Sequence, residues 1–458
     1  LVQPQDQVMA EAVLNMQQSQ QPTVLVLGTG LTAASCARYF SARGVTAVFA
    51  DSRQQPPGWP AVQSVMPEAC LLAGGLPEFA PEGIQTIVVS PGLPLSKTLF
   101  DAARSAGVSV VSDIDLFLAE EVGSVLLVTG SNGKSTVTTL VNHLLCEAGM
   151  SSVAGGNLGT PALDLLDEPH DTAVLELSSF QLERSKLPKS LVATVLNLAV
   201  DHLDQHGSLD AYRDAKLRIY DGCELAVVNR AEPDAIPPEN ANVVSFGLDS
   251  PDEGHWGVAD GSLVFGSRVV MPVSEIPLMG QHNLQNVLAA CAMAHAYGVN
   301  FTQLREGVCS FSALPHRMQR VPTADGINWI NDSKATNEAA AAASIRSTSD
   351  PLILIAGGDG KGSSFSAVAD ALQNRAAQVL VFGKDALTLR DALSPVVPVS
   401  QVADLGSAVA AAYEQACPGT TVLLAPACAS LDMFSNYAER GERFASLVAE
   451  KRIMEVQE

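Results

Sequence analysis

The stretch Gly130-Ser-Asn-Gly-Lys-Ser-Thr136 decides the fold of this chain. It follows the apolar run Val125-Leu-Leu-Val128 and leads into a helical pattern over residues 137–141. A strand, a glycine turn and a helix in this order present backbone N–H groups that bind polyphosphate. Lys134 would then reach the terminal phosphates, and the Ser135 hydroxyl would bind Mg²⁺. The alternative is a Gly-Lys-Ser on a surface turn, which the flanking strand and helix patterns disfavour.

Composition excludes several classes of partner. The chain has 458 residues, of which 27 are basic and 49 acidic, for a net charge of −22. Such an acidic chain is unsuited to nucleic acid or to an anionic membrane surface. No apolar run is long enough to span a bilayer, and residues 1–21, which we expect to form a loosely ordered helical extension, lack the pattern of a signal peptide.

The eight cysteines are scattered along the chain without a Cys-x-x-Cys pair. This distribution favours a reducing compartment and argues against a zinc site or a disulfide framework. We therefore expect a cytoplasmic protein that acts on small molecules, and we expect it to be a monomer.

Three segments share one pattern, in which a short apolar strand runs into a glycine loop: Thr23–Gly30, Ser124–Gly130 and Pro351–Gly358. Near-continuous apolar strands separated by helices predict parallel sheets covered on both faces, and hence an α/β fold. We expect an N-terminal Rossmann-like domain, a central P-loop domain and a C-terminal Rossmann-like domain, at residues 1–112, 113–313 and 314–458. Short strands with Gly, Pro and Asp turns predict an antiparallel patch over about 221–275.

The first glycine loop, Gly28-Thr-Gly30, is followed about 20 residues later by Asp51 at the end of the next predicted strand. This spacing is close to a dinucleotide fingerprint for NAD or FAD. Binding of a different nucleotide and a purely structural turn remain open alternatives. Ser90-Pro-Gly92 ends another predicted strand at the same edge of the sheet.

Polar groups also follow strands in the middle and last segments. Glu176 and His202 lie at predicted strand ends near the P-loop, where open α/β sheets bind ligands. Each is suited to hold Mg²⁺ or to act in acid–base chemistry, and each could also be an ordinary loop residue. Lys216 lies in a helical pattern typical of a solvated lysine, and Asp332 precedes Lys334 in a strand-end loop typical of an ion pair.

Taken together, these motifs resemble the Mur ligase family, the ATP-dependent amide ligases of peptidoglycan precursor synthesis. The resemblance covers residues 23 to 450. It rests on Gly130–Thr136, Glu176-Leu-Ser-Ser179, Asp201-His202, Ala215-Lys-Leu217 and Leu314-Pro-His-Arg317, and it points to the D-glutamate-adding members through Leu177–Glu183, Asn331–Asn337, Gly357–Lys361 and Pro426–Asp432.

The resemblance implies a ligase that adds D-glutamate to UDP-N-acetylmuramoyl-L-alanine through an acyl phosphate. Its implied cofactors are ATP, Mg²⁺ at two sites and a CO₂-derived carbamate on Lys216. The first loop would hold the UDP of the substrate rather than NAD. Gln205 stands where relatives often carry Arg, so one cationic contact to the substrate is in question.

The site residues carried over by the resemblance fall into four groups. The catalytic residues would be Lys134, Glu176, His202 and Lys216, and the metal ligands Ser135, Glu176, His202 and carbamylated Lys216. ATP would be bound by Gly130, Ser131, Asn132, Gly133, Lys134, Ser135, Thr136, Asn286, Arg317 and Asp332. The substrates would be bound by Leu31, Thr32, Asp51, Ser52, Ser90, Gly92 and Asn157, and by Lys334, Thr336, Lys361, Ser430 and Tyr437 on the amino-acid side.

Two other functions compete with this hypothesis. One is a ligase of the same superfamily that adds a different amino acid or extends folate with glutamate. The other is a catalytically silent protein that senses UDP-sugars, which the intact Lys134, Glu176, His202 and Lys216 disfavour.

Overall fold

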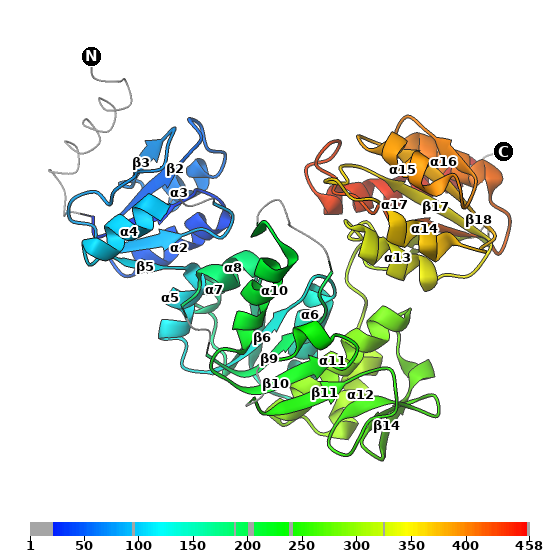
Figure 1. The fold of residues 1–458 in the computed structure, drawn as a ribbon, viewed down its shortest axis with the longest axis horizontal. Coiled ribbons are helices and arrows are strands. Elements are labelled where there is room, and N and C mark those ends of the chain that lie inside the picture. Colours follow the sequence, from blue (N-terminus) through cyan, green and yellow to red (C-terminus); the bar gives the residue numbers. More distant parts are fainter. Residues whose placement is uncertain are drawn as a thin grey trace.

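The computed structural model describes residues 22–93, 97–186, 189–199, 206–237, 241–323 and 326–455. Within these residues the strands form three separate sheets, which appear as three lobes along the chain (Figure 1). The predicted α/β class with parallel sheets is confirmed. No helix in the described part is long and apolar enough to cross a membrane.

The N-terminal sheet has the strand order β3-β2-β1-β4-β5, and all its pairings are parallel. The chain order reverses between β1 and β4, so a ligand crevice is expected at their carboxyl ends. The strands are β1 Val24–Leu27, β2 Ala47–Asp51, β3 Cys70–Ala73, β4 Thr86–Val89 and β5 Ser109–Val111. The helices are α2 Leu31–Ala42, α3 Trp59–Val65, α4 Lys97–Ser105 and α5 Asp113–Glu120.

The central sheet has the order β14-β13-β12-β11-β10-β9-β6-β8-β7, with β6 between β9 and β8. Its strands are β6 Ser124–Thr129, β7 Ser152–Gly156, β8 Thr172–Glu176, β9 Ser190–Val195, β10 Cys223–Asn229, β11 Val243–Phe246, β12 Trp256–Ala259, β13 Ser262–Phe265 and β14 Arg268–Pro272. Its helices are α6 Lys134–Glu147, α7 Ala162–Leu165, α8 Ser179–Arg184, α10 Leu209–Leu217, α11 Gln281–Tyr297 and α12 Phe301–Ser310, with short 3₁₀ turns at Arg218–Tyr220, Pro233–Ala235 and Val273–Glu275.

The antiparallel patch is smaller than the sequence pattern suggested. Within the central sheet, β12, β13 and β14 are the described strands that pair antiparallel, whereas β10 and β11 continue the parallel sheet beside β9. The reason is burial: residues 226–229 of β10 are buried, as expected for an inner strand of a parallel sheet.

The C-terminal sheet has the order β15-β16-β20-β17-β18-β19 and is parallel except for β15. Its strands are β15 Gln319–Val321, β16 Asn328–Asn331, β17 Leu352–Gly357, β18 Ala377–Phe382, β19 Val399–Gln401 and β20 Thr421–Leu424. Its helices are α13 Glu338–Arg346, α14 Ser366–Leu372, α15 Ala386–Leu393, α16 Leu405–Gln415 and α17 Tyr437–Glu455.

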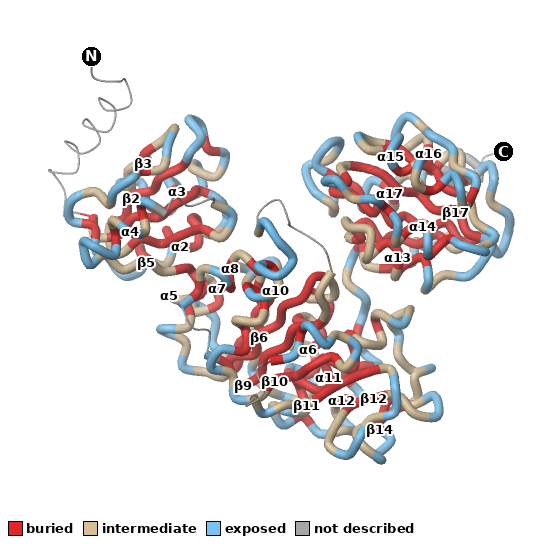
Figure 2. The backbone as a smooth tube through the Cα atoms, viewed as in Figure 1, coloured by how far each residue is buried: buried red, intermediate tan, exposed pale blue. Residues whose placement is uncertain are grey.

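The strands of each lobe consist largely of buried residues (Figure 2), and apolar side chains make up most of the buried set. One core runs from the N-terminal sheet into the central sheet, whereas the C-terminal sheet has cores of its own. Arg38 of α2 forms an ion pair with Asp164 of α7, and Arg184 of α8 donates to the carbonyls of Ser90 and Leu93. The N-terminal lobe is therefore packed directly against the central one.

Candidate active site between the central and C-terminal lobes

The P-loop joins β6 to α6. Gly133, the last residue before α6, has φ +84, and a Cβ built there would lie 2.4 Å from Asn286 Oδ1. Only glycine fits this conformation and this close approach. The first N–H groups of α6 therefore open toward the space beside Asn286, and the helix dipole favours an anion there.

Glu176 lies at the end of β8, where it pairs in register with Val128 of β6. It is 3% exposed, and its Oε1 accepts a hydrogen bond of 2.7 Å from Asn157 Nδ2. Its Oε2 is buried and has no hydrogen-bond partner among the described residues. An unsatisfied buried carboxylate oxygen in a cavity that Ser135 also lines fits a hard divalent cation, which prefers oxygen ligands.

Two lysines converge on one backbone carbonyl. Lys134 Nζ donates to Gly130 O at 2.8 Å, and Lys216 Nζ donates to the same oxygen at 2.9 Å. Lys216 extends from α10, is 2% exposed and lies 4.7 Å from the centre of the Tyr212 ring. The interpretation of Lys216 as a solvated helix lysine is therefore wrong, because its amine is buried against the Gly130 carbonyl of the P-loop.

The C-terminal lobe contributes two cations and a carboxylate to the same space. Arg317 lies just before β15, and burial lowers the pKa of its guanidinium. Asp332 follows β16 and accepts hydrogen bonds from Met318 N and from the Ser344 hydroxyl. Burial raises the pKa of Asp332, and the bond from Ser344 opposes that shift.

Lys334 lies two residues after Asp332, with its Nζ 4.0 Å from the centre of the Tyr437 ring. Burial and the nearby positive charge of Arg317 lower the pKa of Lys334 to about 8. A lysine with this pKa is charged at neutral pH but loses its charge in mildly alkaline solution. Burial also lowers the pKa of His282, at the start of α11, to about 4.

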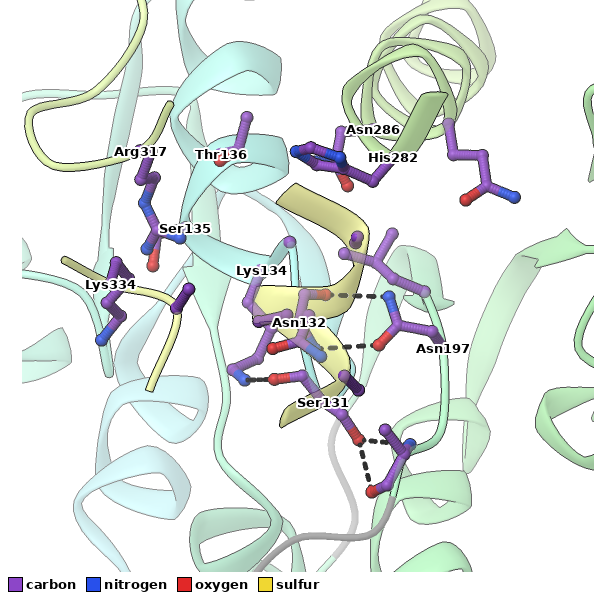
Figure 3. A pocket seen from close by; sticks show the side chains of 18 of the residues that line it. Ser131, Asn132, Lys134, Ser135, Thr136, Asn197, His282, Asn286, Arg317 and Lys334 are labelled. Atoms are coloured by element: carbon purple, nitrogen blue, oxygen red, sulfur yellow. Dashed lines mark hydrogen bonds between the residues drawn. The ribbon is translucent and has the colours of Figure 1, made fainter. Parts of the chain in front are cut away.

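These groups surround one cavity of about 450 Å³ between the central and C-terminal lobes (Figure 3). The expected site residues that line it are Ser131, Asn132, Gly133, Lys134, Ser135, Thr136, Asn157, Glu176, Asn286, Arg317, Asp332, Lys334 and Thr336. Gly130, the first residue of the P-loop, and Lys216, which donates to its carbonyl, are not among the lining residues. Across the cavity, Asn337 Nδ2 donates to Asn132 Oδ1 at 3.2 Å, and Ser347 Oγ lies 3.2 Å from His282 Nδ1.

Sequence reasoning missed several lining residues. Asn197 forms a double hydrogen bond with the backbone of Asn132, at 2.8 and 3.0 Å (Figure 3). His282, Asn283 and Glu232 also line the cavity. Asn197 could have been found, because it ends a strand-like run beside the P-loop. His282 and Asn283 lie in the first turn of α11, just after Gly280, which has φ +93 and precedes the helix. A glycine directly before a helical pattern was the sequence signal that could have pointed to these two residues.

The expected UDP residues lie elsewhere, around the carboxyl ends of β1, β2 and β4. Leu31 is 79% exposed at the start of α2, with Thr32 beside it, and Ser52 and Gly92 are also accessible. The Ser90 Oγ is buried without a hydrogen-bond partner in the described part of the chain.

Asp51 is buried, and its carboxylate accepts bonds from Arg53 and from Thr29 Oγ1 at 2.6 Å. The Arg53 guanidinium holds the pKa of Asp51 well below its usual range. In this structure the Asp51 side chain therefore fixes the first glycine loop rather than pointing outward.

The remaining amino-acid-side candidates do not line the cavity. Lys361 is exposed, with φ +50, in the loop after β17, and Ser430 is buried in the loop after β20. Both loops begin at the same edge of the C-terminal sheet as Lys334. His202 and Gln205, like residues 1–21, lie outside the described residues.

Comparison with protein families gives consecutive matches along the chain. Residues 22–112 match the Mur ligase MurD-like N-terminal domain, residues 128–294 the Mur ligase middle domain, and residues 316–428 the glutamate ligase domain of Mur ligases.

Curated relatives match over nearly their whole length. The UDP-N-acetylmuramoylalanine–D-glutamate ligase of Shewanella oneidensis is 42% identical over 93% of this chain and 97% of its own. The enzyme of the same name from Chromohalobacter salexigens is 43% identical over 93% and 96%.

Solved structures share the fold at lower identity. UDP-N-acetylmuramate-alanine ligase MurC of Thermotoga maritima has a TM-score of 0.60 at 18% identity, covering 94% of this chain and 99% of its own. MurF of Acinetobacter baumannii has a TM-score of 0.60 at 19% identity, covering 96% and 98%. Matches to every lobe, with relatives above 40% identity across the chain, place this protein in the Mur ligase family.

Proposed function

We propose that this chain is an ATP-dependent ligase that joins D-glutamate to UDP-N-acetylmuramoyl-L-alanine in the synthesis of peptidoglycan precursors. The observation that carries the proposal is the composition of the cavity. The cations of Lys134, Arg317 and Lys334 and the buried carboxylate of Glu176 line it together with the P-loop. Both the substrate name and the choice of D-glutamate follow the relatives that are about 40% identical to this chain.

The first step activates the alanyl carboxylate. A carboxylate oxygen attacks the γ-phosphorus of ATP, the bond to the β-phosphate oxygen breaks, and an acyl phosphate and ADP result. Both reactants are anions, so the step needs positive charge around the transferred group. Lys134 lies at the N-terminus of α6 for this purpose, and Arg317 approaches from the C-terminal lobe.

Magnesium fits the oxygen-rich side of the cavity. Ser135 Oγ and the unpartnered Oε2 of Glu176 are ligands of the kind that Mg²⁺ prefers, and Asn157 holds the other Glu176 oxygen. When bound, the metal supplies charge neutralisation at the phosphates. We propose His202 as a further ligand, with a second metal site beside it.

Lys216 fits this scheme as a carbamate. As an ammonium it shares the Gly130 carbonyl with Lys134, so two like charges lie at one acceptor. Addition of CO₂ to the neutral amine, with loss of a proton, replaces the cation by an anionic oxygen group. That group attracts Lys134 and adds an oxygen ligand for magnesium.

The second step forms the amide. The amine of D-glutamate attacks the acyl carbon, and phosphate leaves with the oxygen that came from the carboxylate. Lys334, Thr336 and Lys361 are suited to one carboxylate of glutamate, and Ser430 with the backbone near Tyr437 to the other. Movement of the C-terminal lobe toward the P-loop would bring the amine to the acyl phosphate and exclude water.

The N-terminal lobe would hold the UDP moiety at the carboxyl ends of β1 and β4. Leu31 and Thr32 would meet the diphosphate at the start of α2, with Ser90 and Gly92 beside them. Asp51 would act by fixing the loop, and Ser52 by contacting uracil. We propose domains at 1–112, 113–313 and 314–458, and a cytoplasmic monomer as the working form.

Oxygen tracing tests the proposed chemistry. With both oxygens of the alanyl carboxylate labelled as ¹⁸O, each turnover should place one label in the released phosphate and leave one in the amide. Lys134→Ala is the control, and losing this charge clamp should slow phosphate release by ~10²-fold or more. Unlabelled phosphate, or AMP as the product, would rule out the acyl phosphate route.

A further inference from the structure

Arg440, in the first turn of α17, has no exposed surface. Its guanidinium carries five N–H groups, and the structure gives five hydrogen bonds. Nε donates to Ser333 Oγ at 3.0 Å, and Nη2 donates to Ser333 O at 2.9 Å and to Cys428 O at 3.1 Å. Nη1 donates to Cys428 O at 3.1 Å and to Gly357 O at 3.3 Å. All the acceptors are neutral oxygens.

The three acceptor residues belong to three different loops. Ser333 follows β16, Gly357 ends β17, and Cys428 lies in the loop after β20. These strands are neighbours in the parallel sheet, so their carboxyl ends meet at one edge. One planar side chain therefore sets the spacing of all three loops.

These loops carry the groups that the proposed function assigns to glutamate. Lys334 is the next residue after Ser333, Lys361 lies in the loop that follows Gly357, and Ser430 lies two residues after Cys428. The loops after β17 and β20 are also joined directly, since Asp359 and Ala429 exchange backbone hydrogen bonds of 3.0 and 2.9 Å.

Tyr437 is tied to the same cluster. Ser333 Oγ donates to the Tyr437 carbonyl at 2.8 Å, and the Tyr437 ring lies under Lys334 Nζ. Ser333 thus accepts from Arg440 and donates to the first residue of α17. Movement of the Arg440 side chain would displace Lys334 and Tyr437 together.

We propose that Arg440 is the positioning residue of the amino-acid pocket, fixing the distance between the groups that hold the two carboxylates of the incoming amino acid. This inference rests on the proposed function. A fixed distance between two carboxylate sites determines where the amine of a bound amino acid points, and hence the preference for one stereoisomer. Displacements of about 1 Å at a reacting group can cost ~10²-fold in rate.

A purely structural role would be filled better by another residue. Burial of the guanidinium lowers the pKa of Arg440 to about 10. No carboxylate hydrogen-bonds to it among the described residues, and apolar replacements of buried charges often stabilise proteins. What arginine adds is a rigid fork that bonds three loops at once.

Arg440→Lys tests the proposal, because lysine keeps the charge but presents its three donors from a single nitrogen in place of the planar fork. We expect the KM for D-glutamate to rise by at least ~10-fold and the ratio of D- to L-glutamate use to fall by a similar factor, since ångström-scale misplacement has effects of this size. The KM for the UDP-substrate should change less than about twofold, because that site lies in the N-terminal and central lobes.

Arg375→Lys is the matched control. Arg375 also makes five hydrogen bonds, to Ile345 O, Thr348 and Asp350, but at the opposite edge of the same sheet, just before β18. It should lower the melting temperature without changing the KM for D-glutamate or the stereoselectivity. Ser333→Ala provides a milder second variant, which should raise the KM for D-glutamate while leaving the fold intact.

The possible outcomes distinguish a failure of the proposed function from a failure of the positioning role of Arg440. If the parent protein does not use D-glutamate, the proposed function fails. If the parent uses it and both Arg440→Lys and Ser333→Ala keep the KM and the stereoselectivity, Arg440 has no positioning role. The same loss of selectivity in Arg375→Lys would also overturn the inference, since the effect would then reflect stability alone.

Discussion

Lys134 and Lys216 donate to the same carbonyl oxygen, that of Gly130, at 2.8 and 2.9 Å. Lys134 begins α6 and Lys216 lies in the last turn of α10, so two helices deliver their cations to the first carbonyl of the P-loop. Two ammonium groups at one acceptor repel each other, and the net −22 charge of the chain does not relieve a repulsion this local. This relationship motivates the assignment of Lys216 as a carbamate.

The first prediction concerns that carbamate. Lys216→Ala should be nearly inactive, and formate or acetate should restore part of the activity by returning oxygen ligands to the cavity. Lys216→Arg should not be rescued, because it leaves a permanent cation beside Lys134. Steady-state phosphate release with and without the added acids measures this. Full activity of Lys216→Ala would show that the amine has only a packing role.

Asn157 should act through Glu176. Asn157→Ala removes the amide that donates to Glu176 Oε1, so the Glu176 carboxylate becomes free to rotate. Losing a residue that orients a metal ligand typically weakens metal binding by ~10–100-fold. The magnesium concentration for half-maximal rate should rise accordingly. An unchanged magnesium dependence would remove Asn157 from this role.

The pH dependence should report Lys334. Its pKa of about 8 lies below the ordinary value for lysine, so the charge that we propose attracts the glutamate carboxylate is present at pH 7 and lost by pH 9. The KM for D-glutamate should therefore rise through this window. Lys334→Arg keeps its charge and should flatten the rise. Because the glutamate amine titrates equally in both proteins, an identical alkaline rise in the variant would contradict the assignment.

Stability should respond to Asp113, which begins α5 between the first two lobes. It is buried, its Oδ1 lacks a hydrogen-bond partner among described residues, and burial raises its pKa to about 6. A raised acid pKa means that the folded form binds the proton more tightly than the unfolded form. Its contribution is therefore full below pH ~4 and lost as pH rises through ~6, by about 3 kcal/mol in total.

Asp113→Asn removes this titration. The melting temperature of the variant relative to the parent should increase from pH 5 to about pH 6 and then stay constant to pH 8. Scanning calorimetry of both proteins at matched salt measures the difference. A constant difference across this range would show that Asp113 stays ionised in the folded chain.

The sequence predicted those parts of the site that local pattern determines. The P-loop and the strand-end positions of Glu176 and Asp332 follow from apolar runs and glycine turns, and the three sheets are where those runs predicted them. Convergence at one edge is a property of parallel sheets, so these residues were expected to meet.

What the sequence could not predict depends on long-range packing. Arg440 lies in a charged helical segment that resembles a solvent-facing helix, and only the fold reveals its burial. Likewise, Lys216 has the pattern of an exposed helix lysine until α10 is placed under the P-loop. Asp51 matched a ribose-binding position by spacing, but the partner that orients it, Arg53, depends on the local turn.

Choice of amino acid tests the central claim most directly. Phosphate release from ATP, measured with UDP-N-acetylmuramoyl-L-alanine and a panel of amino acids, should require D-glutamate. Holding both carboxylates places the amine of only one stereoisomer at the acyl phosphate, so L-glutamate should be slower by ~10²-fold or more. L-Lysine and diaminopimelate should be inert. Equal phosphate release with L-glutamate or diaminopimelate would contradict the account and leave only the ligase family standing.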